Sequence, residues 1–200
     1  MKSKQNEQFF LNCLYKGFKM SLLFLFFLTS YAASAQTDFL EIPSITLDGQ
    51  TYDLKWSADV RGTKVIQEYL LPDESVTQYK TKLVVEYILS GESIENIVEA
   101  KLIDLANGKE AGRVLNYKKL ESENPDEILL EFMIGNMRDT VTQSVEWNVY
   151  RYKAVPGGVV LFSMSKRAYE ENNVGPFMQE VSENRLNWIN SIVNYYIGEK

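Results

Sequence analysis

The sequence predicts an α+β fold: a largely antiparallel sheet of about six to eight strands, with two main amphipathic helices packed on it. Short β-prone runs follow one another along the chain and are separated by tight turns, which favours antiparallel pairing. Two segments, 94–106 and 177–196, instead repeat their apolar residues with the helical period. Each helix therefore has an apolar side to bury, and the two are expected to cover one face or opposite faces of the sheet.

Turn residues set the bounds of the expected strands. Asp48-Gly49 lies between two β-prone runs within 45–54, and this dipeptide is a strong hairpin signal. Pro72-Asp73 ends a strand that follows the turn Arg61-Gly62, and Pro156-Gly157-Gly158 joins the last two strands. The other expected strands are 63–71, 80–89, 113–118, 128–134, 145–152 and 159–164.

Both helices have end signals. Ser93 is the expected N-cap of the first helix, and Gly108 is its expected C-terminal stop. In the last helix the apolar stripe runs from Phe177 to Tyr196, and Gly198 follows it.

The first 35 residues have the pattern of a secretory signal peptide. Four lysines precede the apolar run 22–28, and the small-residue triplet Ala33-Ser34-Ala35 follows it. A membrane anchor is the alternative, but a spanning helix needs about 20 apolar residues and this run is far shorter. We therefore expect a signal peptide over 1–35, cleavage before Gln36, and a single α+β domain over 36–200 that begins with a flexible lead-in, 36–43. The mature protein is expected in the periplasm or outside the cell, with no stable membrane anchor.

Composition excludes several kinds of function. The leader carries four Lys and one Glu, so its removal leaves 17 basic and 26 acidic residues, a net charge of −9 that disfavours binding to nucleic acid. The chain has no histidine, and its one cysteine, Cys13, lies in the leader. The mature chain therefore lacks the usual ligands of zinc, copper and haem iron and cannot build a Ser-His-Asp site. No metal, cofactor or catalytic residue is predicted.

The candidate binding residues gather in and near the strand 145–152. Arg151 is in phase with the apolar residues of that strand, so alternation points it toward the buried face. A buried arginine must be paired. One interpretation is a salt bridge that fixes a helix against the sheet; the other is a pocket for a small anionic ligand, lined by Arg151, Arg167, Tyr150 and Tyr152.

Two enzymatic interpretations have weaker support. A hydrolase that uses carboxylates alone is possible in principle, and Glu146 is the most interesting acid because it lies within an aromatic strand. Ser163 and Lys166 match the serine–lysine spacing of penicillin-binding enzymes, but the other motifs of that family are missing. Trp147 and Trp188 lie on expected core faces, and Trp56 is the aromatic residue expected to be partly exposed.

Three segments, 68–76, 147–152 and 183–189, occur in an order that resembles a group of small exported proteins of Gram-negative bacteria without an assigned function. One departure is Tyr79, where that pattern has a tryptophan. The general layout is also similar to Mog1/PsbP-like domains, an antiparallel sheet flanked by helices. The resemblance implies export and a fold but no reaction.

Together these observations favour an exported, non-enzymatic binding or interaction module of the cell envelope, whose partner is an unknown small ligand or an envelope protein. The alternative is a carboxylate-based hydrolase.

Overall fold

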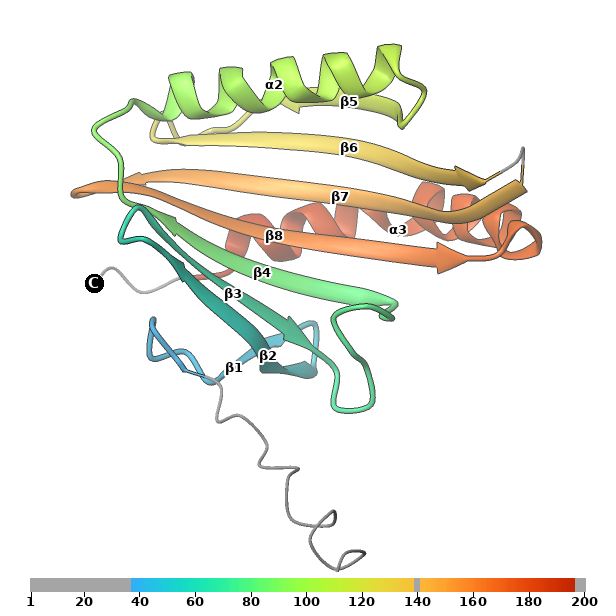
Figure 1. Cartoon of the computed structure of the whole chain (residues 1–200), viewed down its shortest axis with the longest axis horizontal. Helices are drawn as coiled ribbons and strands as arrows, with labels where there is room; N and C mark the ends of the chain where they lie inside the picture. Colours follow the sequence, from blue (N-terminus) through green and yellow to red (C-terminus); the bar gives the residue numbers. More distant parts are fainter. Residues whose placement is uncertain (1–36, 139–140, 197–200) are drawn as a thin grey trace, which may run out of the picture. The chain divides into compact units, whose positions relative to one another are not determined.

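Eight antiparallel strands form one sheet in the order β1-β2-β3-β4-β8-β7-β6-β5 (Figure 1). The computed structural model describes residues 37–138 and 141–196; the expected signal peptide, Cys13 and Gly198 lie outside them. The strands are β1 Ser44–Leu47, β2 Gln50–Val60, β3 Lys64–Leu70, β4 Thr81–Ile88, β5 Val114–Leu120, β6 Glu127–Arg138, β7 Val141–Val155 and β8 Gly158–Tyr169. The helices are α2 Ile94–Glu110, the short 3₁₀ helix η1 Glu171–Asn173, and α3 Val174–Asn194. The α+β class and the largely antiparallel sheet are therefore as predicted.

The sheet consists of two antiparallel halves. Strands β1 to β4 pair in chain order, and β5 to β8 do the same. Along the chain, α2 connects the first half to the second. Strand β8 then pairs with β4 and joins the two halves into one sheet. This pairing brings the middle of the chain beside its last strand.

The Asp48-Gly49 hairpin is confirmed. Both residues have positive φ, 51° and 76°, as a two-residue turn of the type I′ kind requires. The strands after it are longer than predicted: β2 continues to Val60, and β7 begins at Val141 rather than Val145.

In α2 the predicted beginning is confirmed and the predicted stop is wrong. The Ser93 hydroxyl accepts a hydrogen bond from the Asn96 backbone N–H at 3.3 Å. The helix continues past Gly108 to Glu110, and Gly112 takes the positive φ beyond its end. Gly108 has a packing role instead, because a Cβ there would lie 2.6 Å from a methyl group of Val114.

Successive residues of a strand point to opposite faces, and the sheet has a separate buried cluster on each face. One cluster contains Trp147 and Val149 of β7 together with four residues of α3, Phe177, Val181, Ile189 and Ile192. The other contains Tyr152 of β7 together with three residues of α2, Ile94, Val98 and Leu105. Trp147 lies 5.4 Å from Trp188 between ring centroids, and Trp56 is 40% exposed, both as predicted. No helix in the described part of the chain is long and apolar enough to cross a bilayer.

Candidate ligand-binding pocket

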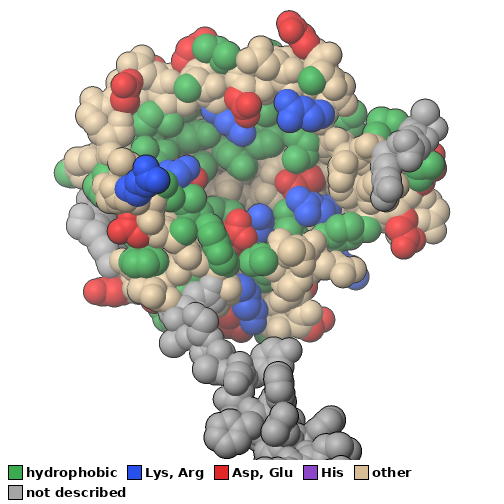
Figure 2. All heavy atoms as spheres, viewed as in Figure 1, with side chains coloured by type: hydrophobic (Ala, Val, Ile, Leu, Met, Phe, Trp, Pro, Cys, Tyr) green, Lys and Arg blue, Asp and Glu red, His purple; other side chains and the backbone are tan. Residues whose placement is uncertain are grey.

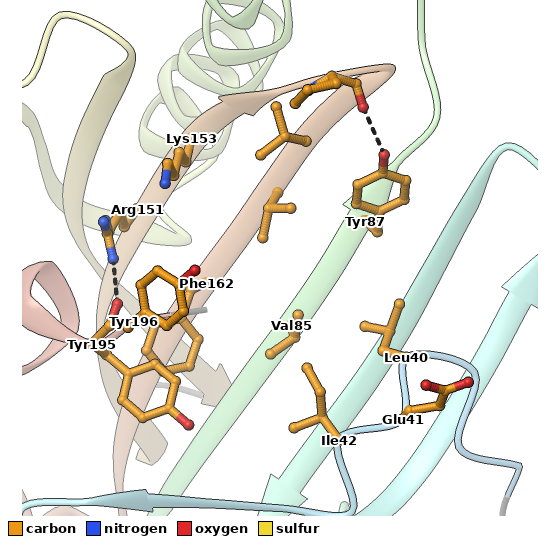
Figure 3. Close-up of a pocket in the computed structure, with 13 residues that line it drawn as sticks. Leu40, Glu41, Ile42, Val85, Tyr87, Arg151, Lys153, Phe162, Tyr195 and Tyr196 are labelled. Carbon is orange, nitrogen blue, oxygen red and sulfur yellow. Dashed lines mark hydrogen bonds between the residues drawn. The ribbon is translucent and has the colours of Figure 1, made fainter. Parts of the chain in front are cut away.

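A cavity of about 370 Å³ lies on the α3 side of the sheet, beyond the C-terminal end of that helix (Figure 3). Its size is within the range of small-molecule sites, roughly 300–1,000 Å³. Three adjacent strands form the floor, and the segments before β1 and after α3 form the walls. The floor residues are Val85 and Tyr87 of β4, Arg151, Lys153 and Val155 of β7, Pro156, and Val160 and Phe162 of β8.

The first wall is the segment Leu40–Ile42, which the buried side chain of Gln67 holds in place. Gln67 accepts a hydrogen bond from the Leu40 backbone N–H at 2.8 Å and donates one to Asp38 at 3.0 Å. Asp38 in turn accepts from the Ile42 N–H at 2.9 Å. Gln67 is 0% exposed, so its amide must be fully bonded and has few other positions available. The expected lead-in thus has no helix or strand from residue 37 to residue 43, yet its backbone is fixed against the sheet.

Glu41, in the middle of this wall, has a φ of 55°. A left-handed backbone costs a residue other than glycine roughly 1–2 kcal/mol. Such strain persists only where the surrounding structure imposes it, and it tends to occur at functional sites. Here the bonds from Asp38 and Gln67 on both sides of Glu41 impose it, so they fix the shape of the wall.

The second wall is Tyr195 and Tyr196, and Arg151 holds its first residue. One guanidinium nitrogen of Arg151, Nη1, donates to the backbone carbonyls of Tyr195 at 2.8 Å and Ile192 at 3.3 Å. The Arg151 Nε donates to the Glu127 carboxylate at 3.0 Å, and Nη2 donates to its other oxygen. The side chains of Arg151 and Glu127 are 11% and 5% exposed. The first interpretation of Arg151 is correct in part: the arginine is in a salt bridge, but that bridge joins β7 to β6, and the helix is fixed by the bonds of Arg151 to the two carbonyls.

Arg151 caps the C-terminal end of α3, which lies at Asn194 and so corrects the predicted extension of the helix to Tyr196. The last turn of α3 contains no basic residue, although the partial negative charge of a helix C-terminus favours one. Arg151 supplies that charge from β7. Tyr195 is extended, with ψ of 124°, and its ring packs 4.9 Å from that of Phe162 on the pocket floor. Burial raises the pKa of Tyr195 above its ordinary value, so its hydroxyl is neutral at physiological pH.

The four predicted binding residues lie on two faces of the sheet. Arg151 lines the cavity, whereas Tyr150 and Tyr152 alternate with it and belong to the cluster on the α2 side. Arg167 pairs with Glu146 across β7 and β8 and so also points to the α2 side. Figure 2 looks onto that face and shows hydrophobic side chains gathered in a hollow, with charged side chains around it. No single pocket contains all four residues, and a ligand role for the three on the α2 side stays a prediction.

The buried acids of the described residues are bonded to arginines. Glu127 pairs with Arg151, and Glu146 accepts from Arg167 at 2.6 Å and from the Tyr79 hydroxyl at 2.7 Å. The third, Glu131, pairs with Arg185. These three carboxylates take part in structural bonds, and none of them lines the cavity.

Glu131 joins α3 to the sheet. It accepts from Arg185 of α3 at 2.7 and 2.8 Å, from the Trp147 indole at 2.8 Å, and forms an ion pair with Lys118 at 3.2 Å. Burial works to raise the pKa of Glu131, but the bonds from Arg185, Trp147 and Lys118 outweigh it, so the pKa lies below its usual value.

The serine–lysine pair is not assembled. Ser163 is paired with Val84 and Tyr150, and Lys166 lies over the ring of Trp188 at 4.3 Å. Because residues 163 and 166 of one strand point to opposite faces, Lys166 cannot activate Ser163. Among residues 37–138 and 141–196, no group of three or more acidic side chains is arranged to hold a metal ion.

Comparison with known proteins identifies the family. The model of an uncharacterised protein family matches residues 40–197. The chain belongs to this family. The match includes every residue of the cavity floor and both walls, from Leu40 to Tyr196. No curated protein and no solved structure matches the chain, so the similarity to Mog1/PsbP-like domains stays a prediction, and family membership assigns no ligand or reaction.

Most of the pocket residues were missed by sequence reasoning. Lys153 could have been found, because it follows Arg151 by two positions and so shares its face. The two walls gave no signal, because segments outside helices and strands have no periodicity from which burial can be inferred.

Proposed function

We propose that the protein is an exported, non-enzymatic binding protein of the cell envelope, which holds a small and largely apolar molecule in the cavity beyond α3. The observation that carries the proposal is the way the cavity is walled. Two buried polar groups, the amide of Gln67 and the Arg151–Glu127 pair, fix two segments that have no regular structure, and both segments line the cavity. A preorganised apolar site with few polar groups is typical of small-molecule recognition.

We further propose that α3 packs on one face of the sheet and α2 on the other. The clusters that α3 and α2 share with the strands support this arrangement. In it, α3 stops short of the cavity and leaves the floor residues Val85, Val160 and Phe162 open to a ligand.

Filling the cavity should weaken binding without unfolding the protein. Val160 is half-buried on the floor, so Val160→Phe places a ring where a ligand would lie. We expect the affinity for an apolar dye such as N-phenyl-1-naphthylamine to fall by about tenfold or more, since a loss of roughly 1.4 kcal/mol is enough for this factor. The measurement is a fluorescence titration of protein purified from cells that express the full chain.

Val84→Phe is the matched control, because Val84 is a half-buried valine in the adjacent strand that faces the other side. It should bind the dye like the wild type. Equal binding by all three proteins would show that the dye occupies another surface and would count against the proposed site.

Export predicts a specific mature mass. After expression of the full chain in a Gram-negative host, intact-mass measurement should give a protein that begins at Gln36 and is found outside the cytoplasm. Ala33→Leu should retain residues 1–35, because the position three residues before the cut requires a small side chain. A wild-type protein that keeps its first 35 residues would contradict the export proposal.

A further inference from the structure

We infer that the ligand of this pocket is a single-chain amphiphile with one negatively charged head group, a long-chain carboxylate, whose head lies at Lys153. The inference rests on the proposed function and specifies its ligand class. It follows from three features of the cavity: the apolar floor, the position of its two basic residues, and the position of its acid.

The middle of the cavity is suited to a hydrocarbon chain. The apolar part of the floor is formed by Val85 of β4 and by Val160 and Phe162 of β8. Leu40 and Ile42 continue this apolar surface onto the first wall (Figure 3). Burying a methylene group on such a surface contributes about 0.8 kcal/mol, so affinity should depend on chain length.

The two basic residues lie together on one side. Arg151 and Lys153 both come from β7, and Figure 3 shows them side by side at the edge of the cavity. Arg151 is already bonded to Glu127 and to two helix carbonyls, so its guanidinium has little capacity for a ligand. The ammonium of Lys153 has three donor hydrogens, so it can bind a head group in addition to a contact within the protein.

The charges around the cavity select the sign and the magnitude of the head-group charge and the direction in which the ligand lies. Glu41 lies on the opposite wall from Lys153 in Figure 3 and repels an anion there. The cavity is also next to the C-terminal end of α3, whose partial negative charge disfavours a doubly charged head group such as a phosphate monoester. A carboxylate carries a single charge, so it satisfies Lys153 with the least repulsion, and its chain then runs toward the lead-in.

Calorimetric titration with saturated carboxylates of increasing length, below their micelle concentrations, tests this inference. The protein is expressed from the full chain and stripped of bound lipid on a hydrophobic resin. Affinity should rise about fourfold per methylene until the cavity is full, and then level off. The carboxylate should bind about tenfold more tightly than the alcohol of the same length. The amine should bind more weakly than the alcohol.

Lys153→Met should remove the preference of carboxylate over alcohol, because the ammonium that distinguishes the two head groups is absent. Lys119→Met, at an exposed lysine of β5, is the matched control and should keep the preference. Equal binding of carboxylate and alcohol by the wild type would overturn the head-group inference, while the proposed function would stand. If neither the carboxylates nor the apolar dye bind, both the inference and the proposed function are wrong.

Discussion

Replacing Arg151 by methionine is expected to lower the free energy of unfolding by about 3–5 kcal/mol, the usual cost of removing one partner of a buried ion pair. Glu127 would be left buried without its guanidinium partner, and the carbonyls of Ile192 and Tyr195 would lose their donor. Urea unfolding of the wild type and the variant, followed by circular dichroism, measures this difference.

A double variant makes the result specific. Arg151→Met combined with Glu127→Leu should recover most of the lost stability, because apolar replacement of both partners is often neutral. The double variant should nevertheless bind the apolar dye more weakly, since nothing then fixes Tyr195 against Phe162. A cost below about 1 kcal/mol for Arg151→Met, as expected for an exposed pair, would show that Arg151 does not hold the wall.

Glu131→Gln should make the protein less stable by about 1.5–3 kcal/mol at pH 7, the range for hydrogen bonds to charged groups. The amide keeps the shape of the side chain but has no negative charge. Its bonds with Arg185, Trp147 and Lys118 are therefore weakened. The folded-state pKa of Glu131 is lowered, so its contribution is complete above the unfolded-state value of about 4.3 and is lost as the pH falls through the folded-state pKa. The difference between wild type and variant should therefore shrink in acid.

Unfolding curves at pH 7, 5, 4 and 3 measure this dependence. Glu99→Gln, on the exposed side of α2, is the control and should stay within about 0.5 kcal/mol of the wild type at every pH. A constant difference between wild type and Glu131→Gln from pH 7 to pH 3 would contradict the assigned role of this carboxylate.

The local pattern of the chain predicted the elements well, because each signal is short-range. The period of 94–106 and the Ser93 cap located α2, and alternation within 145–152 placed Arg151 on the buried face. The partner of Arg151 could not be predicted. Glu127 lies diagonally across from it, two residues from the directly opposite Leu129, only through the register of β6 on β7, which depends on the pairing of the whole sheet.

The candidate pocket was harder to predict than the sheet. Alternation separates Arg151 from Tyr150 and Tyr152, so the rule that placed Arg151 also argues against a pocket made of all three. The walls depend on contacts across long stretches of sequence, from Leu40 to Gln67 and from Arg151 to Tyr195. Such contacts leave no pattern in a single sequence.

Native mass spectrometry of the wild type and Val160→Phe, both purified from the host envelope and then given the apolar dye at a concentration that half-saturates the wild type, tests the binding site most directly. We expect a wild-type protein with one bound small molecule, either its own ligand or the dye, and a Val160→Phe protein that is largely without one. A wild type that carries no added mass, or an added mass that survives Val160→Phe, would contradict the assignment of the cavity as the binding site.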